Sequence, residues 1–122
     1  MEEYKLEGIY YFMDKDGGKP VKAFIHSLTW KEQAKVYAYI TELKIHGNNL
    51  RRPMADYIGD GIYELRPKDN RIFYFFYLRN KAVLVHVIKK HVNKIPLGDL
   101  NVCTRRKREV ESDGDNIEKL EL

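Results

Sequence analysis

The chain has 122 residues, of which 43% are hydrophobic and 12% aromatic, and it carries a formal net charge of +4 at pH 7; this predicts one folded domain and excludes a disordered chain. The single cysteine, Cys103, excludes an intrachain disulfide, and no apolar run approaches the roughly 18 to 20 residues that cross a membrane. The start, MEEYKLEG, is acidic and lacks the apolar core of a signal peptide, so we expect a soluble cytoplasmic protein with no membrane partner.

The first half of the chain predicts a strand and two helices. Residues 5–14 are aromatic and β-branched and predict a strand that ends in the turn DKDGGKP. Residues 20–28 predict a short helix with a proline at its start. Thr29 and Glu32 form a capping box for a longer helix that ends at Gly47, so we expect a helical hairpin.

The second half predicts strands and a final helix. Strand candidates cover residues 61–67, 71–79 and 82–90. The first pair is joined by a four-residue turn, and the second pair by the two-residue turn Asn80-Lys81. Residues 96–112 predict the last helix. The expected fold class is α+β, in which an antiparallel three-strand meander joins the sheet of the N-terminal strand.

The positive charge is concentrated in the middle and late part of the chain. Residues 51–110 hold fourteen Lys/Arg and six Asp/Glu, residues 1–50 hold seven of each, and residues 111–122 hold one Lys and five Asp/Glu. Such a segment suits a polyanion such as nucleic acid, and it is equally compatible with a solvated surface. We expect one domain over residues 1–112 and an acidic tail over residues 113–122.

The two turns predict which cations share a face of the sheet. The first turn places Arg66 opposite Arg71, and the second places Arg71 opposite Lys90. These three cations then form a row at one edge of the sheet, beside Glu64. With an odd second loop, Lys89 takes the place of Lys90, because one residue of register reverses the face.

The same register predicts the residues below this row. It sets Phe73 opposite Ile88 and Phe75 opposite His86. His86 lies among valines and leucines in mid-strand, so we expect a hydrogen-bonded core histidine at this position and no metal ligand.

Four motifs stand out when they are taken together: Gly61-Ile62-Tyr63-Glu64-Leu65-Arg66, Arg71-Ile72, Val85-His86-Val87-Ile88-Lys89-Lys90 and Lys94-Ile95-Pro96. As a set they resemble the HigB-type branch of the RelE/ParE toxin superfamily, including its phage-derived relatives. The stretches KPVKAFIHSL and YITELKIHG resemble that family's helical hairpin, so the resemblance covers roughly residues 6–110. The chain departs from canonical RelE proteins at Glu64, where they carry lysine.

This resemblance implies a RelE-like fold and the toxin of a type II toxin–antitoxin pair, an endoribonuclease that cuts mRNA in the ribosomal A site without a metal or cofactor. The implied partners are the ribosome with its mRNA and a small helix-turn-helix antitoxin of the HigA kind, in a toxin–antitoxin hetero-oligomer. Two alternatives stay open. ParE relatives share the fold and inhibit DNA gyrase, and a non-catalytic RNA-binding module would need no toxicity.

The implied reaction assigns roles to the charged residues. RNA cleavage without metal needs a base for the 2′-OH, stabilisation of the phosphorane and a proton for the leaving 5′ oxygen. Guanidinium groups suit phosphate because they are permanently charged and donate in pairs. The candidate catalytic residues are Arg66, Arg71, Lys89, Lys90 and Glu64. The candidate RNA-contacting residues are Lys68, His91, Lys94 and Arg105, with His91 also a candidate base.

Overall fold

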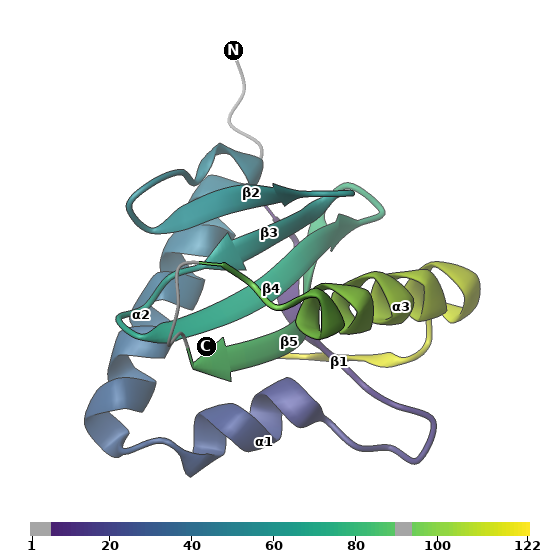
Figure 1. The fold of residues 1–122 in the computed structure, drawn as a ribbon, viewed down its shortest axis with the longest axis horizontal. Coiled ribbons are helices and arrows are strands. Elements are labelled where there is room, and N and C mark those ends of the chain that lie inside the picture. Colours follow the sequence, from purple (N-terminus) through teal and green to yellow (C-terminus); the bar gives the residue numbers. More distant parts are fainter. Residues whose placement is uncertain (1–5, 90–93) are drawn as a thin grey trace.

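The predicted order of strand, helix pair, strands and final helix is present in the computed structural model, which describes residues 6–89 and 94–122. The elements are β1 (Gly8–Phe12), α1 (Pro20–Ser27), α2 (Trp30–His46), the 3-10 turn η1 (Gly47–Asn49), β2 (Ala55–Gly59), β3 (Ile62–Leu65), β4 (Asn70–Tyr77), β5 (Lys81–Lys89), α3 (Leu97–Asp113) and β6 (Ile117–Lys119). The fold is α+β, as predicted (Figure 1).

The strands of the described residues form one mixed sheet in the order β2-β3-β4-β5-β1-β6. The antiparallel meander β3-β4-β5 is the predicted one, and β1 joins it by pairing parallel to β5. Helices α1 and α2 cover one face of the sheet and α3 lies on the other (Figure 1). No helix within the described ranges is long and apolar enough to cross a membrane.

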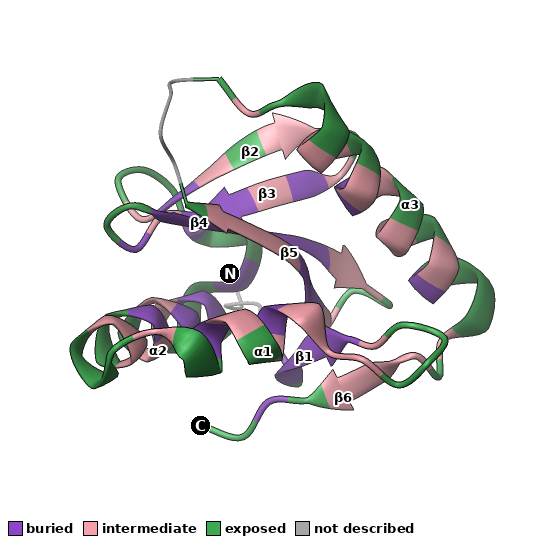
Figure 2. Ribbon diagram, turned by 60° about the horizontal axis from the view of Figure 1, so that its bottom comes forward, coloured by how far each residue is buried: buried purple, intermediate pink, exposed green. Residues whose placement is uncertain are grey.

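Two hydrophobic cores follow from the alternation of side chains along the strands. In β4, Ile72 and Tyr74 point to the α1/α2 side, whereas Phe73 and Phe75 point to the α3 side. The first core takes Val21, Ile25, Val36, Ile40 and Leu43 from the two helices, and the second takes Cys103 and Val110 from α3. Figure 2 shows both layers of buried residues against the sheet.

Helix α2 begins and ends where the sequence predicts. The Thr29 hydroxyl accepts a hydrogen bond from the Glu32 backbone N–H at 3.2 Å, which confirms Thr29 as the N-cap. Gly47 follows the last residue with φ of 55°, a conformation that glycine adopts without steric cost.

Strand β2 lies in a segment for which the sequence predicts no strand. It pairs antiparallel with β3, with Tyr57 opposite Tyr63. The turn between them is short, and both Asp60 and Gly61 adopt positive φ, at 54° and 78°. The Gly-Asp-Gly turn therefore closes a tight hairpin, and β2 becomes one edge of the sheet.

Part of the segment 113–122, which we expected to be an acidic tail, lies in the sheet. Strand β6 pairs antiparallel with β1, with Ile117 opposite Phe12. The Glu118 carboxylate forms ion pairs with Lys19 and Lys22 of the α1 region, at 2.7 and 3.2 Å. Leu120 is only 4% exposed and belongs to the core beneath α1 and α2.

The second hairpin differs from the predicted two-residue turn. Tyr77 pairs with Lys81, so the loop has three residues, and two of them, Leu78 and Arg79, have positive φ. The register then shifts once more between Phe73 and Tyr74, which leaves Val85 as an additional residue in β5. A three-residue loop and a bulge are not visible in hydrophobic alternation alone, because the alternation resumes after each of them.

Candidate functional site

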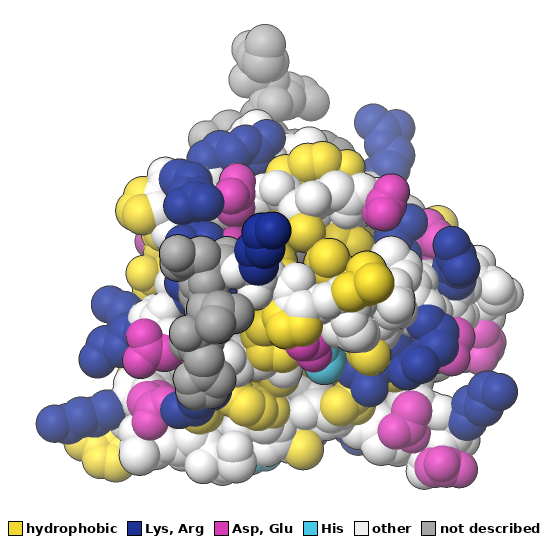
Figure 3. Space-filling model, in the orientation of Figure 1, with side chains coloured by type: hydrophobic (Ala, Val, Ile, Leu, Met, Phe, Trp, Pro, Cys, Tyr) yellow, Lys and Arg dark blue, Asp and Glu magenta, His cyan; other side chains and the backbone are white. Residues whose placement is uncertain are grey.

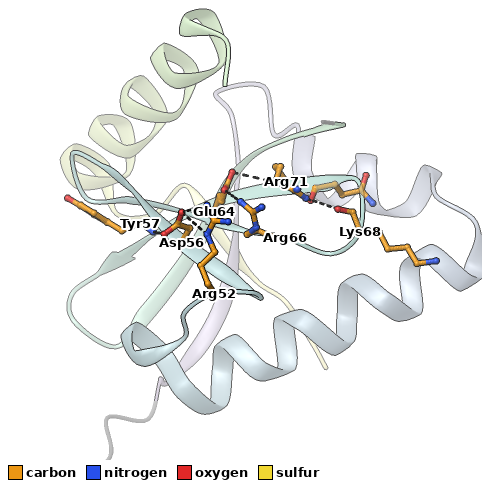
Figure 4. A network of polar contacts seen from close by, with 8 residues as sticks. Arg52, Asp56, Tyr57, Glu64, Arg66, Lys68 and Arg71 are labelled. Carbon is orange, nitrogen blue, oxygen red and sulfur yellow. Dashed lines mark hydrogen bonds and ion pairs between the residues drawn. The ribbon is translucent and has the colours of Figure 1, made fainter. Parts of the chain in front are cut away.

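The first hairpin brings together the acid and the two arginines that the sequence singled out. In the β3–β4 register Leu65 lies opposite Ile72 and Glu64 opposite Phe73, as predicted. Arg66 and Arg71 consequently flank the turn between the strands, on the face of the sheet that carries α3 (Figure 4).

Glu64 lies between the two guanidinium groups. Its Oε2 accepts a hydrogen bond from Arg66 Nη1, and its Oε1 lies 4.0 Å from Arg71 Nε. The three side chains are only 6%, 15% and 9% exposed for Glu64, Arg66 and Arg71. Two arginines share one carboxylate, so the cluster has an excess positive charge. Because the cluster is largely buried, water screens this charge only weakly.

Arg71 is fixed from its other side by the backbone of the turn. Its Nη1 donates to the carbonyl oxygens of Lys68 and Asn70, at 2.7 and 2.8 Å. Its Nε is buried and has no hydrogen-bond partner among the described residues. Burial lowers the pKa of Arg71, and the neighbouring Arg66 lowers it further. The guanidinium remains a cation and retains a donor for an additional acceptor.

Lys68 at the tip of the turn adopts a left-handed backbone conformation, with φ of 54°. This conformation is uncommon for a residue with a side chain. It turns the Lys68 carbonyl toward Arg71 while the side chain lines a cavity of about 260 Å³ on the other side of the turn. Lys35 and Lys89 line the same cavity, together with Glu32 and Asp69.

A second ion pair, between Arg52 and Asp56 of the edge strand β2, was not predicted from the sequence. Asp56 lies opposite Glu64, and its Oδ2 accepts two hydrogen bonds from Arg52, at 3.1 and 2.9 Å. Figure 4 shows this pair beside the Glu64 cluster. The available signal was the Asp60-Gly61 turn, which would have predicted a hairpin. A bulge between Tyr57 and Gly59 then places Asp56 across from Glu64.

The predicted row does not continue into β5 as expected. Arg71 lies opposite Ile88 and not opposite Lys90, because of the three-residue loop and the bulge. Lys89 lies opposite Asn70, and its Nζ is 3.4 Å from Glu32 of α2, on the other face of the sheet. Lys89 therefore does not replace Lys90 beside the arginines.

The outcome for the remaining predicted residues is mixed. Lys90 and His91 lie outside the described residues. Lys94 is exposed just before α3. Arg105 of α3 lines a separate cavity of about 610 Å³, which is bounded by the loop after β1 and by the end of α3.

His86 is the hydrogen-bonded histidine that the sequence predicted, in a different register. It lies opposite Phe73 instead of Phe75, and its ring stacks on Phe73 at a centroid distance of 6.0 Å. Its Nε2 lies 2.8 Å from Asp99 Oδ1 at the start of α3, and its Nδ1 lies 3.4 Å from Arg106 Nη1. With both nitrogens engaged, His86 connects α3 to the sheet.

The described residues form neither a metal site nor a reactive thiol. Within residues 6–89 and 94–122, no three His, Cys, Asp or Glu side chains are placed to hold a metal ion. Burial raises the pKa of the Cys103 thiol to about 12, which suppresses its thiolate form at neutral pH.

The face of the sheet that carries α3 has the charge distribution of a surface for a polyanion. Figure 3 shows hydrophobic side chains in the middle of this face, with Lys and Arg side chains around its rim and Asp and Glu side chains among them. The Glu64–Arg66–Arg71 cluster can stabilise a phosphate or another oxyanion, because its donors are fixed before the ligand arrives.

A comparison with protein families matches residues 23–108 to the family described as phage-derived protein Gp49-like (DUF891). This span includes α2 and β2 to β5 with the whole Glu64–Arg66–Arg71 cluster. A search of curated proteins found no match.

Proposed function

Because the chain belongs to the phage-derived Gp49-like family, a family of the RelE/HigB-like toxin type, we propose that it is the toxin of a type II toxin–antitoxin pair and that it cuts mRNA on the ribosome. Family membership implies an antitoxin partner. The nuclease reaction, the ribosome and a HigA-like helix-turn-helix antitoxin are part of the proposal.

The observation that supports the nuclease most directly is the buried pair of arginines that share Glu64. In RNA cleavage without metal, the 2′-OH attacks the adjacent phosphorus, negative charge builds on the phosphorane, and the 5′ oxygen leaves with a proton. Arg66 and Arg71 are proposed to bind the non-bridging oxygens as this charge develops.

Glu64 is proposed to hold the two guanidinium groups in place. Both of its oxygens face arginines, and such an arrangement favours positioning over proton transfer. The acid and the base of the reaction are proposed to come from the substrate's surroundings on the ribosome or from Lys90 and His91.

Further RNA contacts are proposed along the turn and beside α3. Lys68 and Lys89 line the cavity on the other side of the turn from the cluster, where a single strand that passes around the turn would place its neighbouring phosphates. Lys94 is proposed to extend this track. Arg105, which lies in a different cavity, is proposed to touch ribosomal RNA.

The decisive experiment adds the purified protein to translating ribosomes and maps the ends of the mRNA. We expect new 5′ ends within codons in the presence of the protein and far fewer with Arg71→Lys. If synthesis stops while the mRNA stays intact, the nuclease is rejected. DNA damage with intact mRNA after induction would then favour the gyrase inhibitor.

A further inference from the structure

The outer face of α2 carries an apolar stripe that points away from the sheet. Trp30, Ala34, Ala38, Thr41 and Ile45 follow one another at intervals of four, four, three and four residues, which places them on one side of a helix. All five are exposed, with Trp30 at 75% and Ile45 at 50%. The opposite side of the same helix packs on the sheet, so the stripe plays no part in this core (Figure 2).

The middle of the stripe is hollowed. A groove of about 370 Å³ is lined by Ala34, Tyr37, Ala38, Thr41, Glu121 and Leu122. The small side chains in its centre allow the backbone of another helix to come close, and the larger Trp30 and Ile45 stand at the two ends as anchors. The last residues of the chain form one wall, because Leu120 is anchored in the core.

The charges along the stripe select the kind of partner. Lys31 and Lys35 border it on one side and Lys44 on the other, at the positions that helical geometry gives them. In the part of the chain that the structure describes, none of these three ammonium groups forms an ion pair, whereas the α2 acids Glu32 and Glu42 are paired with Lys89 and His46. Glu121 contributes one carboxylate to the groove lining, so the three lysines leave an excess of positive charge around it.

From this arrangement we infer that the outer face of α2 is a docking surface for an acidic amphipathic helix of a partner protein. The apolar side of that helix lies in the groove between Trp30 and Ile45, and its carboxylates lie over Lys31, Lys35 and Lys44. A second copy of this chain is disfavoured, because its α2 brings the same lysines and each chain has a net charge of +4. The identification of this helix with part of the antitoxin rests on the proposed function.

Trp30, the only tryptophan in the chain, makes the surface observable. Two synthetic helices with the same leucine stripe, one flanked by glutamates and one by lysines, are titrated into the full-length protein while tryptophan emission is recorded. We expect a saturable blue shift with the acidic peptide, weakened by salt, and none with the basic peptide. Equal binding of both peptides, or no binding of the acidic one, overturns the inference.

A matched pair of variants locates the contact. Ala38→Glu places a carboxylate in the groove and is expected to weaken binding of the acidic peptide by about tenfold or more. Ala23→Glu makes the same change at an exposed position of α1 and should bind as the unchanged protein does. Circular dichroism checks that both fold. If the Ala38→Glu protein binds as tightly as the unchanged chain, the surface is wrong.

The link to the antitoxin is tested separately. When the antitoxin is co-expressed, cells carrying the Ala38→Glu chain should remain inhibited, whereas those carrying Ala23→Glu should recover. The Arg71→Lys protein should still bind the acidic peptide. If the unchanged protein binds the acidic peptide but does not cleave mRNA, the proposed function is removed and the docking surface remains. If it cleaves mRNA but does not bind the peptide, the surface alone is removed.

Discussion

At the scale of single residues, the arrangement of Arg71 leads to the sharpest expectation about activity. Arg71→Lys keeps the positive charge but loses the planar guanidinium, in which Nη1 bonds the turn carbonyls while the other nitrogens stay at fixed positions for a further acceptor. We expect mRNA cleavage to fall by about 10²-fold or more, the usual cost of one lost donor to a developing oxyanion. The measurement is the rate of appearance of cleaved ends on translating ribosomes.

Arg108→Lys is the matched control for this prediction. Arg108 lies on α3 and lines the separate cavity near the end of that helix, so the same chemical change there should leave the rate unchanged. An Arg71→Lys protein that cuts as fast as the Arg108→Lys protein would remove Arg71 from the site.

An isosteric substitution distinguishes a positioning role of Glu64 from that of a general base. Glu64→Gln keeps the shape of the side chain and leaves two buried guanidinium groups without a counter-charge. We expect a loss of about 1–3 kcal/mol in the free energy of unfolding and reduced cleavage with an unchanged pH dependence.

Denaturant titration measures the first effect and pH–rate profiles measure the second. A positioning role leaves the shape of the profile intact, because no proton of Glu64 is transferred. If the acidic limb of the profile disappears in the Glu64→Gln protein, Glu64 is the base and the role proposed above is wrong.

At the scale of elements, β6 is attached by charge as well as by pairing with β1. Lys19 and Lys22 lower the pKa of Glu118 below its ordinary value of 4.5. Since the folded pKa is the depressed one, Glu118 stabilises the folded chain above the unfolded pKa, and this contribution is lost as pH falls through the folded pKa.

The Glu118→Gln protein is therefore expected to have a lower Tm than the unchanged chain at pH 7 and a similar Tm near pH 3. Thermal unfolding at the two pH values tests this. Glu121→Gln removes an exposed carboxylate of the same tail outside the ion pairs and should show no such difference. A constant Tm difference for Glu118→Gln across the pH range contradicts the linkage.

The β4–β5 loop stores backbone strain that one substitution should release. Arg79 has φ of 73°, where glycine meets no Cβ clash. We expect Arg79→Gly to raise the free energy of unfolding by about 1 kcal/mol, as measured by urea denaturation. Asn80→Gly, in the same loop at a position without positive φ, should lower the free energy of unfolding. If both substitutions lower it by the same amount, the strain argument is refuted.

The β3–β4 and β4–β5 hairpins show how much of the site the sequence predicts. The position of Arg66 and Arg71 around Glu64 was predictable, because the first turn is a four-residue segment rich in turn formers between two alternating strands. The partner of Arg71 in β5 was not, since the loop length and the bulge at Val85 depend on backbone packing that leaves no periodic signal. The pair Arg52–Asp56 was missed for a different reason, because β2 is an edge strand and reads as a connector.

At the scale of the whole molecule, charge and fold act together in the expected binding of RNA. The segment 51–110, with fourteen Lys/Arg and six Asp/Glu, supplies all of β2 to β5 and most of α3, so part of its excess charge lies on the face that Figure 3 views. Binding of a single-stranded polyanion to such a surface releases counterions, and the logarithm of the affinity falls linearly with the logarithm of the salt concentration.

The slope of that line tests which lysines contact the backbone. Each phosphate contact on a single strand contributes about 0.7 to the slope, so Lys68→Gln together with Lys89→Gln should reduce it by roughly 1.4. The readout is fluorescence anisotropy of a labelled oligoribonucleotide at several salt concentrations, with the Arg71→Lys background used to prevent cleavage. Lys15→Gln with Lys119→Gln removes the same charge elsewhere and serves as the control. Equal reductions by both pairs would mean that the net charge of the chain, and not the cavity lined by Lys68 and Lys89, sets the affinity for RNA.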